Sequence, residues 1–301
     1  MVQSRKPIAW ILGCAAIVAI SFAVGCRDLR TENDGRIYRV VEDDLGRTVR
    51  LPDRVERAIS LAPSLTEMTF AAGAGDRLVG VTTYCNFPAE TVGIAKVGDT
   101  QSPNVEKIIA LQPQVVLVST ASQLESFMSI LAGQSIAVYV LDVRGINDVP
   151  AGLRKLGAVF GTNQASESAA MELERRINSF SKAKETEPQP RVFLQISKEP
   201  LFTIGKESFL TELIQRAGGV SVTKDVASGY PKLSKETALA MNPDVIILSD
   251  SEDNREPNEV FKNSSAVKNG RVYKIDADII SRPGPRLVDA LEEIGKILRS
   301  K

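Results

Sequence analysis

Residues Asn104–Ser119 read NVEKIIALQPQVVLVS, and residues Ser234–Ser249 read SKETALAMNPDVIILS. Aligned without a gap, the two stretches share Glu106/Glu236, Ala110/Ala240, Pro113/Pro243, Val115/Val245 and Ser119/Ser249. Each begins with an Asn or Ser followed two residues later by glutamate, which is typical of a helix N-terminus. A proline then ends the helix, and the apolar, β-branched run behind it predicts a buried strand. The chain therefore contains one helix–strand unit twice.

A second repeat lies upstream of each of these stretches. Leu65-Thr66-Glu67 followed by Ala72-Gly73 matches Leu210-Thr211-Glu212 followed by Ala217-Gly218. Strands alternating with helices in two matching halves predict an α/β protein of two similar, Rossmann-like lobes. A ligand bound in a cleft between the lobes is the natural hypothesis for such an arrangement.

The two lobes differ in length between these repeats. Glu67 and Glu106 are 39 positions apart, whereas Glu212 and Glu236 are 24 apart, so the first lobe has 15 more residues here. The extra length falls in residues 83–103, which carry aromatic residues, prolines and glycines. We expect this long loop to contribute to the ligand site, because binding residues are concentrated on such loops.

The N-terminus has the pattern of an export signal. Residues 1–26 start with a positive pair, Arg5 and Lys6, and continue as an uncharged apolar run. The run ends in Ala23-Val24-Gly25-Cys26, which resembles the lipobox of bacterial lipoproteins. We predict that Cys26 is lipidated and becomes the mature N-terminus, so that the protein is extracytoplasmic and membrane-anchored. An uncleaved membrane anchor is the alternative.

The remaining patterns divide the mature chain. We expect a polar tether at 27–36, an N-terminal lobe at 37–163, a connecting helix at 164–187 and a C-terminal lobe at 188–301. The connecting helix is predicted from the longest amphipathic pattern of the chain, which exceeds what one small lobe needs.

Composition excludes several classes of function. The 37 basic and 37 acidic residues balance, so nothing indicates a nucleic-acid partner. The chain has no histidine, which excludes histidine-rich metal sites and Ser–His or Cys–His catalytic pairs. It also lacks the glycine-rich phosphate motifs of Rossmann enzymes. We expect no enzyme activity and no cofactor, and we keep an enzyme on a Rossmann-like scaffold as the alternative class. Cys85 is interpreted as a small hydrophobic residue, with a thiolate bond to cobalt or iron as the alternative.

Several short stretches resemble one known family. They are Ile59–Pro63 (ISLAP), Thr66-Glu67, Phe70–Gly73 (FAAG), Arg191–Gln195 (RVFLQ), Phe202-Thr203, Gly205–Ser208 (GKES) and Pro285-Arg286. The chain is similar, over about residues 37–300, to the substrate-binding lipoproteins of bacterial ABC importers for siderophores, haem and cobalamin. The resemblance implies two α/β lobes joined by one long helix. It also implies delivery of a ligand to an ABC permease, a transmembrane dimer with ATPase subunits.

The resemblance is strongest to the cobalamin binders of that family. Tyr84 and Phe202 match aromatic residues that line the cleft there, and Tyr230 stands at a tryptophan position. Asp278 and Arg282 match the acidic and basic residues that hold corrin amides. Phe87 is added because its Cys-Asn-Phe-Pro context indicates an exposed loop. The expected ligand-binding residues are Tyr84, Phe87, Phe202, Tyr230, Asp278 and Arg282. Two further tryptophan positions are occupied here by Thr100 and Ser119.

The repeated glutamates are expected to have two different roles. Glu106 and Glu236 fit a helix-dipole role, and the resemblance implies that one such glutamate per lobe pairs with permease arginines. We favour docking, because a pseudo-symmetric partner needs matched contacts. Glu67 and Glu212 lie a few residues into their helices, where a capping-box role would suffice. Arg286 is expected to cap or pair structurally at the last helix.

The expected ligand is cobalamin or a related corrinoid, bound between the lobes without reaction. A ferric siderophore or haem is the alternative within the same family. Haem would have to use a tyrosine as its axial ligand, because no histidine is present.

Overall fold

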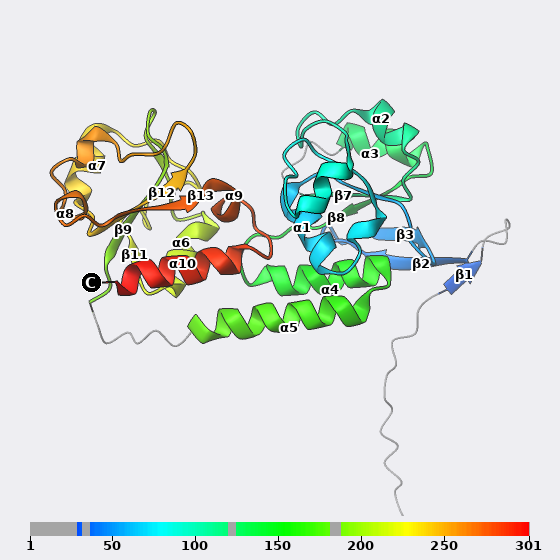
Figure 1. The fold of residues 1–301 in the computed structure, drawn as a ribbon. Coiled ribbons are helices and arrows are strands. Elements are labelled where there is room, and N and C mark those ends of the chain that lie inside the picture. The colour runs from blue at the N-terminus through cyan, green and yellow to red at the C-terminus, as the bar shows by residue number, and fades with distance from the viewer. Residues whose placement is uncertain (1–28, 32–36, 120–124, 181–187, 301) are drawn as a thin grey trace, which may run out of the picture.

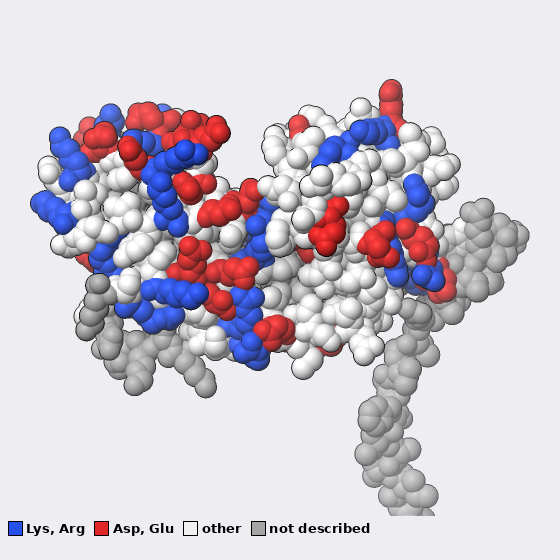
Figure 2. Space-filling model, viewed as in Figure 1, with Lys and Arg blue, Asp and Glu red and all other residues white. Residues whose placement is uncertain are grey.

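The computed structural model describes residues 29–31, 37–119, 125–180 and 188–300, and it consists of two lobes above a shared layer of helices (Figure 1). The expected signal peptide and Cys26 lie outside the described residues. Figure 2 shows the lobes separated by an open groove on their upper side and joined below it, where charged side chains of both signs gather. No helix within the described ranges is long and apolar enough to cross a membrane.

The N-terminal lobe is built on a parallel five-stranded sheet with the order β6-β5-β4-β7-β8. Its strands are β4 (Ala58–Ser60), β5 (Leu78–Val81), β6 (Ala95–Lys96), β7 (Val115–Val118) and β8 (Ala137–Val140). Its helices are α1 (Pro63–Ala71), η1 (Gly75–Arg77), η2 (Ala89–Gly93), α2 (Val105–Ala110), α3 (Glu125–Ala132) and α4 (Asp148–Phe160). Strand β7 is buried along its whole length, as its uninterrupted apolar run predicts.

A separate antiparallel hairpin precedes this sheet. Strands β2 (Ile37–Glu42) and β3 (Thr48–Pro52) pair around the Asp43–Gly46 turn. A third strand, β1 (Leu29–Thr31), pairs antiparallel with β2. It lies inside the segment that we expected to be only a tether.

The C-terminal lobe has a sheet with the order β10-β9-β12-β13, and β11 also pairs with β9. Its strands are β9 (Arg191–Ser197), β10 (Phe202–Thr203), β11 (Val220–Ser221), β12 (Val245–Asp250) and β13 (Val272–Asp276). Its helices are α6 (Phe209–Arg216), α7 (Lys235–Met241), η3 (Glu259–Phe261), α8 (Ser265–Lys268), α9 (Ala277–Ile280) and α10 (Leu287–Arg299). Every pairing is parallel except that of β10 with β9.

The sequence repeat is also a structural repeat. The order β5-β4-β7-β8 in one lobe corresponds to β11-β9-β12-β13 in the other, with α1 and α2 matching α6 and α7. The repeated valines hold equivalent register positions, since Val115 pairs with Ala58 and Val245 with Val192. The prediction of two similar α/β lobes is therefore confirmed.

The repeated helices begin and end as their sequences predict. Asn104 accepts a hydrogen bond from the Lys107 N–H, and Ser234 accepts one from the Thr237 N–H. The residue before each repeated proline has a positive φ, +47° at Gln112 and +36° at Asn242. Both copies therefore leave the helix through the same left-handed turn before the strand starts.

Helix α5 (Asn163–Phe180) connects the lobes. It packs against α4 at one end and runs beneath α10 at the other (Figure 1). Arg176 binds Asp289 and Glu292 of α10 at 2.6 and 2.8 Å. The two helices approach closely at Gly295, where an added Cβ would overlap the Phe180 ring. The expected helix extends to residue 187, but residues 181–187 lie outside the described part.

Candidate functional site

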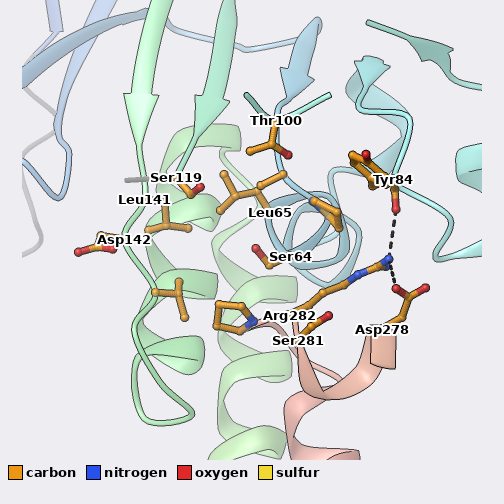
Figure 3. A pocket seen from close by; sticks show the side chains of 14 residues that line it. Ser64, Leu65, Tyr84, Thr100, Ser119, Leu141, Asp142, Asp278, Ser281 and Arg282 are labelled. Carbon is orange, nitrogen blue, oxygen red and sulfur yellow. Dashed lines mark hydrogen bonds and ion pairs between the residues drawn. The ribbon is translucent and has the colours of Figure 1, made fainter. Parts of the chain in front are cut away.

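A cavity of about 410 Å³ lies where the lobes face each other. It is lined by Ala62, Pro63, Ser64, Leu65, Tyr84, Thr100, Ser119, Leu141, Asp142, Val143, Asp278, Ser281, Arg282 and Pro283 (Figure 3). Most of these residues directly follow the carboxyl ends of β4, β7 and β8. Tyr84 and Thr100 lie on the loop at 83–103, and the rest belong to α9 and the segment after it. Ligands of open α/β sheets bind at the carboxyl ends of the strands, beside the point where the strand order reverses. That point here lies between β4 and β7.

Tyr84 is the aromatic side chain of the cavity. It follows β5 on the long loop at 83–103, and 61% of its surface is exposed. Cys85, next to it, points into the lobe instead. Its Sγ lies 3.2 Å from the Thr66 Oγ1 and 3.1 Å from the Thr82 Oγ1. Cys85 is buried and does not line the cavity, which fits its interpretation as a small hydrophobic residue.

Asp278 and Arg282 lie at the cavity, as expected, and they also bind the opposite lobe. The Arg282 Nη2 is 2.6 Å from the Asp278 Oδ1, which fixes the two side chains against each other. Arg282 donates to the Asn86 Oδ1 at 2.7 Å and to the Tyr84 carbonyl at 3.2 Å. The Asn86 amide donates to the second Asp278 oxygen at 2.6 Å. These bonds hold the Tyr84 loop against the C-terminal lobe.

Glu67 is the centre of this contact between the lobes. Only 2% of its side chain is exposed. The Arg286 Nε and Nη2 donate to its two oxygens at 2.9 and 2.6 Å, and the Arg282 Nη1 lies 3.3 Å away. The hydrogen bond with Glu67 raises the pKa of Arg286 above its ordinary value. We call Glu67, Asn86, Asp278, Arg282 and Arg286 the interlobe clasp.

The capping-box interpretation of Glu67 is wrong. Helix α1 begins at Pro63, its N-cap is Ala62, and no side chain caps it. Proline is favoured at the first helical position because its missing N–H would be unpaired there anyway. Ser64 is therefore already inside the helix, and Glu67 is free to face Arg286. Arg286 has the structural pairing role that we expected.

Glu212, the repeat equivalent of Glu67, also connects the lobes rather than capping a helix. The N-cap of α6 is Ser208. Glu212 instead accepts from the Asn147 amide of the other lobe at 2.9 Å and from the Arg216 Nε at 3.0 Å. It differs from Glu67 in burial, since 44% of its side chain is exposed. The repetition of both glutamates in apolar segments was the available signal for this role.

Three of the expected ligand-binding residues do not line the cavity. Phe87 is exposed, and the Arg286 guanidinium lies over its ring at 4.3 Å. Phe202 is half-buried on β10, and Tyr230 is exposed on the loop before α7. The structure therefore brings together Tyr84, Asp278 and Arg282. It also places Thr100 and Ser119 in the cavity wall.

Glu106 and Glu236 are exposed second residues of α2 and α7. Figure 1 shows both helices on the upper side of the two lobes, the side on which the groove opens. The backbone N–H of Glu236 and the Ser234 hydroxyl bond to the Glu236 carboxylate, and these bonds hold its pKa below the ordinary value.

A larger hollow of about 1070 Å³ lies elsewhere, between the β2–β3 hairpin and the α3–β8 segment. None of the expected ligand-binding residues lines it. Within the described residues, no group of three or more Cys, Asp or Glu side chains is placed to hold a metal ion.

The chain is similar to one family of known proteins and to individual members of it. The family of periplasmic binding proteins matches residues 59–279. An ABC transporter substrate-binding lipoprotein of Bacillus subtilis is 28% identical, over 94% of both chains. A vitamin B12-binding protein of Pectobacterium atrosepticum is 31% identical, over 79% of this chain and 87% of its own.

Solved structures show the same fold. The periplasmic vitamin B12-binding protein of Vibrio cholerae superimposes with a TM-score of 0.70 at 28% identity, covering 81% of this chain and 97% of that one. A periplasmic haem-binding protein of Pseudomonas aeruginosa superimposes with a TM-score of 0.72 at 23% identity, covering 82% and 94%. The second likeness bears on the fold alone.

Proposed function

The chain belongs to the periplasmic binding protein family, and from this premise we propose that it binds a corrinoid in the interlobe cavity and delivers it to an ABC permease. The observation that carries the proposal is the cavity itself, where Tyr84, Asp278 and Arg282 meet from opposite lobes. Relatives named for vitamin B12 binding support the choice of ligand.

The chemistry of the cavity suits such a ligand. Tyr84 offers a flat apolar surface, and the loop that carries it is held by Asn86, Asp278 and Arg282. A cavity of about 410 Å³ accommodates a drug-sized molecule. A corrinoid is larger, so one edge of it would fill the cavity and the rest would extend into the groove between the lobes.

Calorimetry tests the proposal. The mature protein is titrated with cyanocobalamin, dicyanocobinamide, haemin and a ferric hydroxamate. We expect tight binding of one or both corrinoids. Failure of both corrinoids to bind, together with tight binding of an iron chelate, would transfer the function to iron uptake.

Haem is the second candidate because of one observation. Tyr84 is the phenol among the cavity-lining side chains, and its exposure would let it reach a haem iron. Haemin binding that disappears in Tyr84→Phe would support this candidate.

Two further parts belong to the proposal. Glu106 and Glu236 are the contacts with the permease, one from each lobe, and the repeat supports them because it gives both lobes the same helix start. Lipidation at Cys26 keeps the protein near that permease, and the Ala23–Cys26 sequence supports it.

A further inference from the structure

Four Ser and Thr side chains of the cavity wall end in a hydroxyl group. Ser64, Thr100, Ser119 and Ser281 all line the cavity. Their side chains make no hydrogen bond to any described residue. Ser64 is only 9% exposed. Thr100 and Ser119 are half-buried, and Ser281 is exposed. All four hydroxyls face the open cavity, so a ligand that displaces the water there has to offer them hydrogen bonds in its place.

The hydroxyls are arranged around an apolar strip. In Figure 3, Thr100 lies above Leu65, Ser119 lies to its left, and Ser64 and Ser281 lie below it. Leu141 continues the apolar surface beside Ser119. The cavity is therefore an apolar floor with a polar rim, rather than a stack of aromatic rings.

The charged groups of the cavity are already engaged. Arg282 is the cation among the cavity-lining residues, and its guanidinium contacts Asp278, Glu67 and Asn86. Only 11% of its side chain is exposed. A ligand that presents carboxylates would therefore be repelled by Asp142 and Asp278, while Arg282 is already paired with protein carboxylates. A neutral ligand with hydrogen-bonding groups avoids this electrostatic cost.

We propose that Ser64, Thr100, Ser119 and Ser281 determine specificity by hydrogen-bonding the amide side chains on the rim of a corrinoid, which enters the cavity edge-on. This inference rests on the proposed function and goes further, because it assigns the choice of ligand to four hydroxyl side chains that no resemblance singles out. A hydroxyl both donates and accepts, and a primary amide offers two donors and one acceptor. Either end of each amide can therefore pair with a rim hydroxyl.

The proposal separates corrinoids from haem by chemistry. A corrinoid rim carries many neutral amides, whereas haem carries two carboxylates that only accept hydrogen bonds. Stacking cannot make the same distinction, because both ligands are flat. Thr100 and Ser119 are too small to stack, and among the described residues that line the cavity Tyr84 is the one with an aromatic side chain. Specificity at this site therefore depends on the rim.

The first experiment removes the hydroxyls one at a time. Ser64→Ala, Thr100→Val and Ser119→Ala are titrated with dicyanocobinamide by calorimetry. We expect each to weaken binding roughly fivefold to tenfold, the usual effect of one neutral hydrogen bond. Thr83→Val is the matched control, because Thr83 is exposed on the Tyr84 loop but does not line the cavity. Unchanged thermal unfolding shows that each variant is folded.

The second experiment changes the ligand instead. The wild-type protein is titrated with cobyrinic acid, whose rim carries carboxylates in place of amides. We expect binding at least a hundredfold weaker than that of dicyanocobinamide. Equal binding of the two corrinoids would overturn the proposal.

The outcomes distinguish this inference from the proposed function. Wild-type protein that binds no corrinoid refutes both. Wild-type protein that binds dicyanocobinamide, with hydroxyl variants that bind it equally well, refutes the rim alone. If Tyr84→Ala abolishes binding while all three hydroxyl variants bind normally, recognition depends on stacking and the inference is wrong.

Discussion

Glu67 is nearly inaccessible to solvent and faces two guanidinium groups from the other lobe. A buried ion pair contributes little net stability, but removing one partner leaves an uncompensated charge that is expensive to keep buried. We therefore expect Glu67→Gln to lower the free energy of unfolding by about 3–5 kcal/mol. Chemical denaturation of the variant and the wild type measures this difference.

Glu212→Gln is the matched control, because Glu212 holds the same repeat position and also bonds to the opposite lobe. Its side chain is 44% exposed, so solvent can compensate Arg216, and the loss should be less than about 1 kcal/mol. If Glu67→Gln and Glu212→Gln lost the same free energy of unfolding, burial would not be what makes Glu67 the more important of the two.

Asp43, in the β2–β3 turn, gives a prediction about pH. Burial raises the pKa of its carboxyl, but bonds from the Arg47 side chain, the Arg47 N–H and the Leu45 N–H lower it more. The pKa of the folded state thus lies below the unfolded value of about 3.9. The resulting stability is fully present above the unfolded pKa and is lost as pH falls through the folded one.

We expect Asp43→Asn to be less stable than the wild type at neutral pH and to show a flatter fall in stability below about pH 5. Urea unfolding at a series of pH values tests this. Asp76→Asn, at an exposed aspartate, is the control and should follow the wild type. Parallel curves for Asp43→Asn and the wild type would contradict the assignment.

At the scale of elements, the repeat made α2, β7, α7 and β12 predictable. Local signals were enough there, because a capping side chain, a proline and an apolar run all lie within sixteen residues. The role of Glu67 was interpreted wrongly for the opposite reason. Its place a few residues into α1 fits a capping box, and only the position of Arg286, 219 residues later, shows what Glu67 contacts.

The exposed glutamates of α2 and α7 give a prediction about transport. Changing Glu106 and Glu236 together to Arg should abolish ligand transport, because permease arginines would then meet like charges. Ligand affinity should not change, since neither residue lines the cavity. Each helix loses a favourable dipole contact worth only about 0.3–1 kcal/mol, so the fold is retained. Uptake of labelled cobalamin in cells and calorimetry on the purified variant measure the two effects.

Glu172→Arg on α5 is the control for charge reversal, because α5 lies on the lower side of the lobes (Figure 1). It should transport normally. If the double variant loses ligand binding while it remains folded, the two glutamates belong to the ligand site instead of the docking surface.

At the scale of the whole molecule, sequence predicted the two α/β lobes, but only some of the residues that it proposed for the ligand site line the cavity. Tyr84, Asp278 and Arg282, which were chosen from recognisable stretches, do line it, and their role in binding stays a prediction. The clasp and the hydroxyl rim were missed, since both depend on how one lobe faces the other. Phe202 and Tyr230 were chosen from single loops, and neither lines the cavity.

Lipidation is a prediction for the intact cell. The chain should begin at Cys26 after processing and partition into membranes, because the apolar run before it ends in the small residues of a lipobox. Cys26→Ser should release the protein or stop its processing. Intact mass and membrane fractionation decide this, and an unmodified N-terminus at another residue would refute it.

The last prediction concerns the angle between the lobes. The buried core is continuous across both lobes, and α5 is tied to α10 through Arg176. The clasp adds Glu67 between Arg282 and Arg286. Closing the lobes by a large rotation would break all of these contacts at once. Binding dicyanocobinamide should therefore leave the radius of gyration unchanged within error in small-angle X-ray scattering. Glu67→Gln should scatter as a slightly more expanded particle before ligand is added and contract when it binds. A large contraction of the wild type on binding would show that the clasp opens and closes during the transport cycle.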